Sequence, residues 1–252
     1  MSCQESDEMV KDLVMEMVAR NPIEPLARAM YGWVSAAGCR DGQLRQVMDR
    51  ILRPNSNCVD VGSGRGRALR EILRRAPHGR HLVIEPAPER FARLKTQFPQ
   101  VVMHNVAASD ETGEGTCAPV WSLTLERLIS RRCAVRTDSG TYRVLMAALD
   151  DLIPQDLAVR LLRVNVPGGE IRVLSGALGL IRRCHPYLVF HVARDGGQEP
   201  VVQPDEIYDL LTENGLAISL MDDWLNGHSP IAREAFASQF RSGQQTYFLA
   251  HP

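Results

Sequence analysis

Three glycines and two acidic residues are spaced in this sequence in a way that suits a nucleotide-type cofactor. Asp60 precedes Gly62, Gly64 and Gly66, and Glu85 closes the next predicted strand. Glycines allow a sharp turn between a strand and a helix, and they let the backbone approach a ligand closely. A carboxylate at the end of the following strand suits the two hydroxyls of a ribose. The pattern therefore predicts a cofactor site at the carboxyl edge of a parallel sheet.

The charge of Asp60 bears on which cofactor this site takes. Nicotinamide enzymes favour G-x-G-x-x-G and place a pyrophosphate on the helix N-terminus, where a nearby anion would repel it. S-adenosylmethionine carries a sulfonium and an amino group and no phosphate. We therefore favour the methyl donor, with a nicotinamide cofactor or a turn that binds no ligand as the alternatives.

The elements that must position this site alternate between strands and helices over most of the chain, which is typical of a parallel sheet. Strands are predicted at Cys58–Val61, His81–Ile84, Val101–Asn105, Arg160–Asn165, Tyr187–His191, Leu216–Met221 and Gln245–Ala250. Helices are predicted after the glycines, around Leu69 to Ala76, and at Pro88–Phe98, Glu170–Arg182, Pro204–Asn214 and Pro230–Phe240.

Two segments stand outside this alternation. Residues 1–56 form a predicted helical prefix to the same unit, with helices at Met9–Ala19, Pro25–Ala37 and Gln43–Leu52. Residues 57–252 form the predicted catalytic domain, and residues 109–154 are an insertion of mixed composition that we expect to carry function.

Composition limits the classes of protein to which the chain can belong. The 252 residues are 44% hydrophobic and carry a net charge of −1, which is ordinary for a globular protein and gives no overall attraction for nucleic acid. Six arginines lie between positions 65 and 80, either as a phosphate-binding face or, as we favour, as the solvated side of a helix. The scattered cysteines and the absence of a membrane span predict a cytoplasmic protein with reduced thiols.

Five motifs resemble the FkbM-type S-adenosylmethionine-dependent methyltransferases. They are Val59 to Gly64 (VDVGSG), Ile84 to Pro88 (IEPAP), Val106 to Gly113 (VAASDETG), Leu149 to Ile153 (LDDLI) and Gly168 to Ala177 (GGEIRVLSGA). The resemblance implies an α/β fold, a doubly wound seven-stranded, mostly parallel sheet of the Rossmann-like class I methyltransferase type. It also implies an antiparallel C-terminal hairpin and a small-molecule methyl acceptor, mostly a hydroxyl on a sugar, lipid or natural product.

The resemblance also implies roles for individual residues of the donor site. Asp60, Gly62, Ser63 and Gly64 would border the methionine part of the donor. Glu85 would hold the ribose hydroxyls, with Pro86 beside it in the same motif, and Val106 and Ala107 would flank the adenine.

The chain departs from the family on the acceptor side. The family's lysine-x-aspartate-x-glutamate-glycine is replaced by a segment in which Asn165 stands for the aspartate and Pro167 for the glutamate. His191 stands where the fifth strand usually ends in a glutamate. These changes predict catalysis without a metal ion, because hard cations prefer carboxylates.

His191 is the candidate general base and Asn165 the candidate group that orients the acceptor. Alternatively, His191 is a structural histidine that forms a hydrogen bond within the sheet. Asp110, Asp150 and Asp151 are further candidate bases. A cofactor-binding partner protein without catalysis, or an NAD-dependent oxidoreductase, are the alternative functions.

Overall fold

The structure, a computed structural model, describes residues 41–117, 142–166, 168–191, 204–242 and 247–252. The chain divides into two compact units, residues 1–50 and 51–252. In the first unit residues 41–50 are helical, as predicted for that part of the prefix, whereas the two earlier predicted helices lie outside the described residues. The predicted division at residue 56 stays a prediction.

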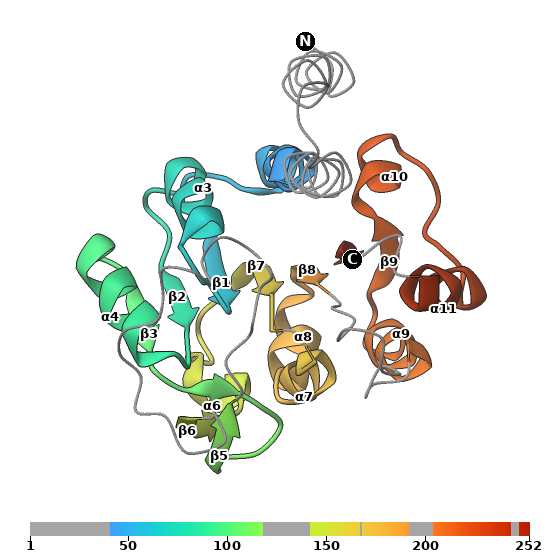
Figure 1. Ribbon diagram of the computed structural model, residues 1–252. Helices are drawn as coiled ribbons and strands as arrows, with labels where there is room; N and C mark the ends of the chain where they lie inside the picture. The colour runs from blue at the N-terminus through green and yellow to red at the C-terminus, as the bar shows by residue number, and fades with distance from the viewer. Residues whose placement is uncertain (1–40, 118–141, 167, 192–203, 243–246) are drawn as a thin grey trace, which may run out of the picture. The chain divides into compact units, whose positions relative to one another are not determined.

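The second unit is built on a seven-stranded sheet, shown with its helices in Figure 1. The strand order is β3-β2-β1-β7-β8-β10-β9. The bounds are β1 Asn57–Val61, β2 His81–Ile84, β3 Val102–His104, β7 Val159–Val164, β8 Tyr187–His191, β9 Ala217–Leu220 and β10 Tyr247–His251. Neighbours from β3 to β8 pair in parallel, and β10 is antiparallel to both β8 and β9. The predicted mostly parallel sheet and its antiparallel C-terminal strands are confirmed.

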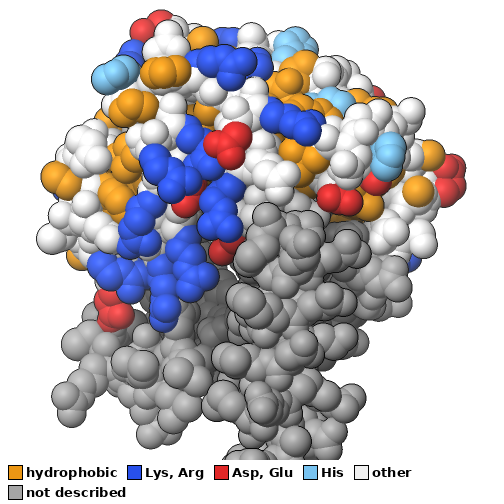
Figure 2. Space-filling model, turned by 90° about the horizontal axis from the view of Figure 1, so that it is seen from above, with side chains coloured by type: hydrophobic (Ala, Val, Ile, Leu, Met, Phe, Trp, Pro, Cys, Tyr) orange, Lys and Arg blue, Asp and Glu red, His pale blue; other side chains and the backbone are white. Residues whose placement is uncertain are grey.

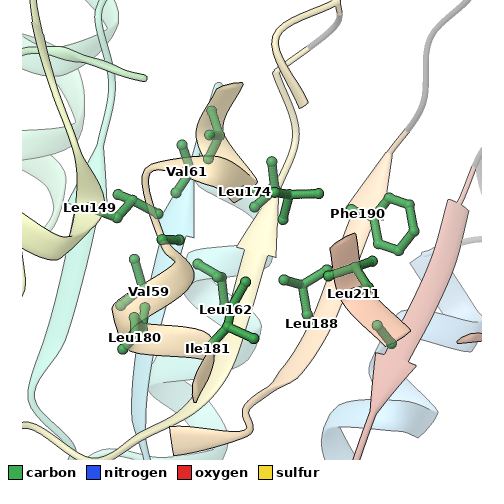
Figure 3. Close-up of a cluster of buried hydrophobic side chains, with 14 of the residues drawn as sticks. Val59, Val61, Leu149, Leu162, Leu174, Leu180, Ile181, Leu188, Phe190 and Leu211 are labelled. Atoms are coloured by element: carbon green, nitrogen blue, oxygen red, sulfur yellow. The ribbon is translucent and has the colours of Figure 1, made fainter. Parts of the chain in front are cut away.

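Helices pack on both faces of this sheet because alternate strand residues are apolar on each side. They are α3 Arg67–Arg75, α4 Pro88–Gln97, α6 Leu149–Leu152, α7 Glu170–Ser175, α8 Leu178–Cys184, α9 Pro204–Glu213, α10 Met221–Leu225 and α11 Arg233–Ser242. Figure 3 shows the larger apolar cluster, in which Val59 and Leu162 of the sheet meet Leu149, Leu180 and Leu211 of the helices.

The opposite face of the sheet carries a smaller apolar cluster beside the glycine turn. Val83 of β2 packs there with Leu69 of α3 and with Leu94 and Phe98 at the end of α4. This cluster fixes α3 and α4, the two helices that follow the loops expected to bind the donor, against the first two strands. The two loops are therefore held in place by buried side chains directly behind them.

The predicted helix at Glu170–Arg182 is wrong, because the structure has two helices, α7 and α8, with Gly176 between them. A Cβ atom on Gly176 would lie 1.9 Å from the carbonyl oxygen of Ser109, so the chain turns where another segment approaches its backbone. The side chain of Asp150 then accepts hydrogen bonds from the backbone N–H groups of Gly179 and Leu180, both at 2.7 Å. These contacts satisfy the first N–H groups of α8.

The predicted insertion, residues 109–154, contains regular structure at both of its described ends. Its strands β5 Gly113–Cys117 and β6 Tyr142–Ala147 form a three-stranded sheet with β4 Ala107–Ala108, which lies just before the insertion, in the order β4-β6-β5. Its middle, residues 118–141, lies outside the described residues. The expectation that this insertion carries function stays a prediction.

The arginines near α3 are mostly exposed. Arg74 and Arg75 both pair with Glu71, and the guanidinium of Arg70 lies 5.7 Å from the centre of the Phe98 ring. Figure 2 shows Lys and Arg side chains gathered over part of one face of the molecule, with a few acidic side chains among them. Pairing with Glu71 is consistent with the solvated face of an amphipathic helix.

Candidate functional site

The glycine turn that follows β1 adopts backbone angles that other residues resist. Gly62, Gly64 and Gly66 have φ values of +73°, +58° and +72°, all in the left-handed region. The N–H of Gly62 donates to the carbonyl oxygen of Ile84 at 2.9 Å, which ties the turn to β2. The carbonyl oxygen of Gly66 accepts the first helical hydrogen bond of α3, from Arg70 at 3.0 Å. The predicted strand–turn–helix unit is therefore present.

Gly64 differs from its two neighbours in what surrounds it. A Cβ atom on Gly62 or Gly66 would lie 2.2 Å from Asn165 or 2.7 Å from Phe98, respectively, so protein atoms fill the space there. A Cβ atom on Gly64 would meet nothing within 4 Å. The middle of the turn thus presents bare backbone to an open space at the carboxyl edge of the sheet, where open α/β sheets bind their ligands.

Glu85, directly after β2, is joined to this turn. Its side chain is 2% exposed, Oε2 accepts a hydrogen bond from the N–H of Gly64 at 3.1 Å, and Oε1 accepts one from the N–H of Ala87 at 3.2 Å. Burial raises the pKa of the Glu85 carboxyl, while the Gly64 N–H and the Arg90 guanidinium oppose that rise. Each carboxylate oxygen retains a second lone pair, so Glu85 has acceptor capacity for ribose hydroxyls.

The segment after β3 lies beside Glu85. The side-chain amide of Asn105 donates to the carbonyl oxygens of Glu85 at 2.8 Å and of Pro86 at 3.1 Å. Val106 and Ala107 follow and are half-buried. The structure therefore gathers the turn, Glu85, Pro86 and the two residues predicted for the adenine along one edge of the sheet.

Asp60 forms an ion pair that the sequence analysis did not predict. It is 1% exposed, and its Oδ1 accepts a hydrogen bond from Nη1 of Arg163 at 2.7 Å across the β1–β7 pair. The negative charge of Asp60, which the sequence analysis matched to the cationic donor, is thus balanced by Arg163 within the sheet. An arginine in the apolar run LLRVNV was the available signal, since a buried charge needs a partner.

Two buried polar atoms beside this pair have no hydrogen-bond partner among the described residues. They are Oδ2 of Asp60 and Oγ of Ser63. Buried polar groups in proteins nearly always form hydrogen bonds, so these two atoms beside the glycine turn call for an explanation. The burial of Cys58 and, to a lesser extent, the nearby Asp60 carboxylate raise the pKa of the Cys58 thiol to about 12, which keeps that cysteine protonated.

The two candidate catalytic residues lie on neighbouring strands. The N–H of Asn165 donates to the carbonyl oxygen of Val61 at 2.9 Å, which places Asn165 just past β7 and next to the glycine turn. Val164 is paired with Phe190, so His191, one residue on, lies beside Asn165 at the same edge. The His191 ring is half-buried, and its centre lies 4.4 Å from that of Tyr247. Pro167 lies outside the described residues.

A family model described as the methyltransferase FkbM domain matches residues 60–216, more than half of the chain. The chain belongs to this family. It is therefore related to the S-adenosylmethionine-dependent FkbM methyltransferases, and the resemblance inferred from the sequence is confirmed. No curated protein matches the sequence significantly.

Solved structures of methyltransferases are similar to this FkbM domain at low identity. Methyltransferase FkbM from Methylobacillus flagellatus KT is 16% identical, with a TM-score of 0.47 over 80% of this chain and 44% of that one. The chain thus spans less than half the length of that relative. Geranyl diphosphate C-methyltransferase from Streptomyces coelicolor A3(2) is 14% identical, with a TM-score of 0.44 over 88% and 81%. A TehB-like SAM-dependent methyltransferase from Corynebacterium glutamicum is 16% identical, with a TM-score of 0.40 over 92% and 97%.

Three further motifs of the FkbM domain contact one another. Arg172 pairs with Asp110 at 2.7 Å and with Glu111, and the Thr112 hydroxyl donates to Asp151 at 3.1 Å. Asp150 is bonded to the backbone of α8, as described above. The three aspartates considered as bases therefore each have a structural partner, and the Arg172 side chain holds the pKa of Asp110 below its ordinary value.

The described residues also bear on the expectations about a metal ion and a membrane span. No group of three or more His, Cys, Asp or Glu side chains in this part of the chain could hold a metal ion. None of the helices described here has the length and apolar character needed to span a bilayer.

Proposed function

We propose that this FkbM domain transfers a methyl group from S-adenosylmethionine to a hydroxyl group of a small molecule such as a sugar, a lipid or a natural product. The single observation that carries the proposal is the open backbone at Gly64, hydrogen-bonded to the buried carboxylate of Glu85. Together they supply room for a ligand and an acceptor for its ribose.

The residues of the site match the chemical groups of the donor. Glu85 would accept hydrogen bonds from the ribose hydroxyls, and Val106 and Ala107 would offer an apolar surface to the adenine. Gly62, Ser63 and Gly64 would border the methionine part, with Asp60 behind them. When bound, the donor supplies a methyl group on a positively charged sulfur, which leaves as the neutral thioether.

The acceptor side would be formed by Asn165 and His191. His191 would accept the proton that the acceptor hydroxyl loses as its oxygen takes the methyl group from sulfur. Asn165 can orient the hydroxyl through its amide, which needs no charge. Most of the rate enhancement would come from holding the two reactants in line.

Calorimetric titration with S-adenosylmethionine, S-adenosylhomocysteine and NAD tests the donor part of the proposal. We expect both sulfur compounds to bind and NAD not to bind. Incubation with radiolabelled donor and a panel of sugars, lipids and phenols then tests the acceptor class. Binding of NAD with no binding of either sulfur compound would refute the proposal.

A second function is favoured by one specific observation. Asn165, Pro167 and His191 replace three carboxylates of the family pattern on the acceptor side. A protein that binds the donor without transferring its methyl group would show calorimetric binding and no labelled product from any acceptor, in the presence or absence of added cations.

A further inference from the structure

The buried ion pair between Asp60 and Arg163 lies directly behind the donor-site turn. The two residues face each other on adjacent strands, and their side chains are 1% and 9% exposed. Gly62 and Asn165 follow them by two residues each and lie just past the ends of β1 and β7. The pair therefore lies directly before both the turn expected to bind the donor and the residue expected to orient the acceptor.

The ends of these two strands are held together by three contacts. Arg163 donates to Asp60 at 2.7 Å, the Asn165 N–H donates to the Val61 carbonyl oxygen at 2.9 Å, and Gly62 packs against the Asn165 carbonyl. The backbone contacts would form with many side chains at position 163. Of these three contacts, the ion pair is the one that depends on the arginine side chain.

We propose that Arg163 is a positioning residue of the donor site, an inference that rests on the proposed function. By holding Oδ1 of Asp60, it fixes the orientation of the carboxylate just before the glycine turn and leaves Oδ2 without a hydrogen-bond partner among the described residues. Oδ2 of Asp60 and Oγ of Ser63, both buried and without a hydrogen-bond partner among the described residues, are then the atoms that would accept hydrogen bonds from the ammonium group of the donor's methionine part.

The chemistry of this site favours a cationic group over water alone. An ammonium has three donors and no acceptor, and both unsatisfied oxygen atoms can accept. A hydrogen bond to an ionised acceptor is stronger than one between neutral groups. Because Arg163 donates to Oδ1, the buried Oδ2 keeps its capacity to accept a hydrogen bond from the ligand.

The experiment compares Arg163→Met, Arg163→Lys, and Arg163→Met combined with Asp60→Asn. Arg163→Met leaves a buried carboxylate without its cation, so both thermal stability and donor affinity should fall. The double variant buries no unpaired charge, so its melting temperature should recover toward that of the wild type. Its affinity for S-adenosylmethionine should stay about tenfold or more below the wild type, because the charged acceptor is gone.

Arg163→Lys should retain most of the donor affinity, since it keeps a cation that can reach Asp60. Arg160→Met is the matched control: Arg160 lies on the same strand, is exposed, and stacks on the Tyr187 ring at 4.6 Å instead of reaching the site. We expect it to bind the donor like the wild type.

Two outcomes would overturn the inference. If the double variant regained donor affinity together with stability, the pair would be purely structural. If Arg163→Met bound the donor as tightly as the wild type, Arg163 would have no part in the site. In both cases the wild type binds the donor, so the proposed function survives. Absence of donor binding by the wild type would remove the proposed function itself.

Discussion

A Cβ atom on Gly62 would lie 2.2 Å from the carbonyl oxygen of Asn165, so the turn proposed to bind the donor and the residue proposed to orient the acceptor meet at bare backbone. No side chain fits between them, and Gly62 also has a φ of +73°. The distance between the two halves of the site is therefore set by the chain itself. A change at either position is expected to affect both.

Gly62→Ala should destabilise the fold and abolish donor binding. The methyl group must displace the Asn165 backbone in addition to adopting a left-handed φ, and we expect a loss of about 2 kcal/mol or more in the free energy of unfolding. Gly64→Ala is the matched comparison, since it faces open space and has only the conformational cost. Gly64→Ala should lose donor affinity with a smaller loss of stability. Urea unfolding and calorimetry of both variants measure this, and equal stability losses would contradict it.

Donor binding should weaken on acidification earlier than for an ordinary glutamate. Burial raises the pKa of Glu85, so its carboxylate takes up a proton at a higher pH than the usual value of about 4.3. Since the ionised form accepts the ribose hydroxyls, affinity is present above this pKa and falls as pH drops through it. Calorimetry as a function of pH tests this prediction. Glu85→Gln should bind weakly at every pH and lose this dependence.

The fold was largely predictable because its signals are local. Buried apolar runs bounded by turns gave β1, β2 and β8 almost to the residue. The break within the predicted helix at Glu170–Arg182 could not be predicted, because at Gly176 the chain turns against Ser109, a residue distant in sequence.

The three-stranded sheet was missed for a similar reason. Its strand β5 reads GEGTC, which has little intrinsic preference for a strand, and its pairing with β6 joins segments far apart in the sequence. In the candidate site, Asp60 and Glu85 could be picked out from spacing. The partner of Asp60 could not, because strand order and register decide that Arg163 lies opposite it.

Gly176→Ala should destabilise the protein without any direct effect on the donor site. Its Cβ would lie 1.9 Å from the Ser109 carbonyl oxygen, so α7 or the segment after β4 must shift, at a cost of about 1–3 kcal/mol. Gly113→Ala is the control, since a Cβ there meets nothing within 4 Å. Thermal unfolding of both variants provides the measurement. A melting temperature for Gly176→Ala as high as that of Gly113→Ala would show that the contact is unimportant.

Methyl transfer should not require a metal ion. Asn165 offers a neutral amide where the family has an aspartate, and Pro167 removes a side-chain oxygen altogether, whereas hard cations prefer several carboxylates. Turnover should therefore be unchanged after exhaustive treatment with EDTA. The prediction is wrong if chelation abolishes turnover and magnesium or manganese restores it.

His191→Asn should lower turnover by roughly 100-fold or more, because general-base catalysis by a positioned side chain typically contributes that much. His191 ends β8 beside Asn165, with its ring 4.4 Å from Tyr247, and it lies away from Glu85 and the glycine turn along the sheet order. Donor affinity should therefore stay close to that of the wild type, and the wild-type rate should fall as pH drops through the range in which a histidine becomes protonated.

His185→Asn is the matched control for this prediction. His185 ends α8 at the start of the loop that enters β8, with a left-handed φ of +41°, which asparagine also tolerates. This substitution should leave turnover and its pH profile unchanged. Full turnover in His191→Asn would contradict a base at that position and leave the positioning of the two reactants as the source of the rate.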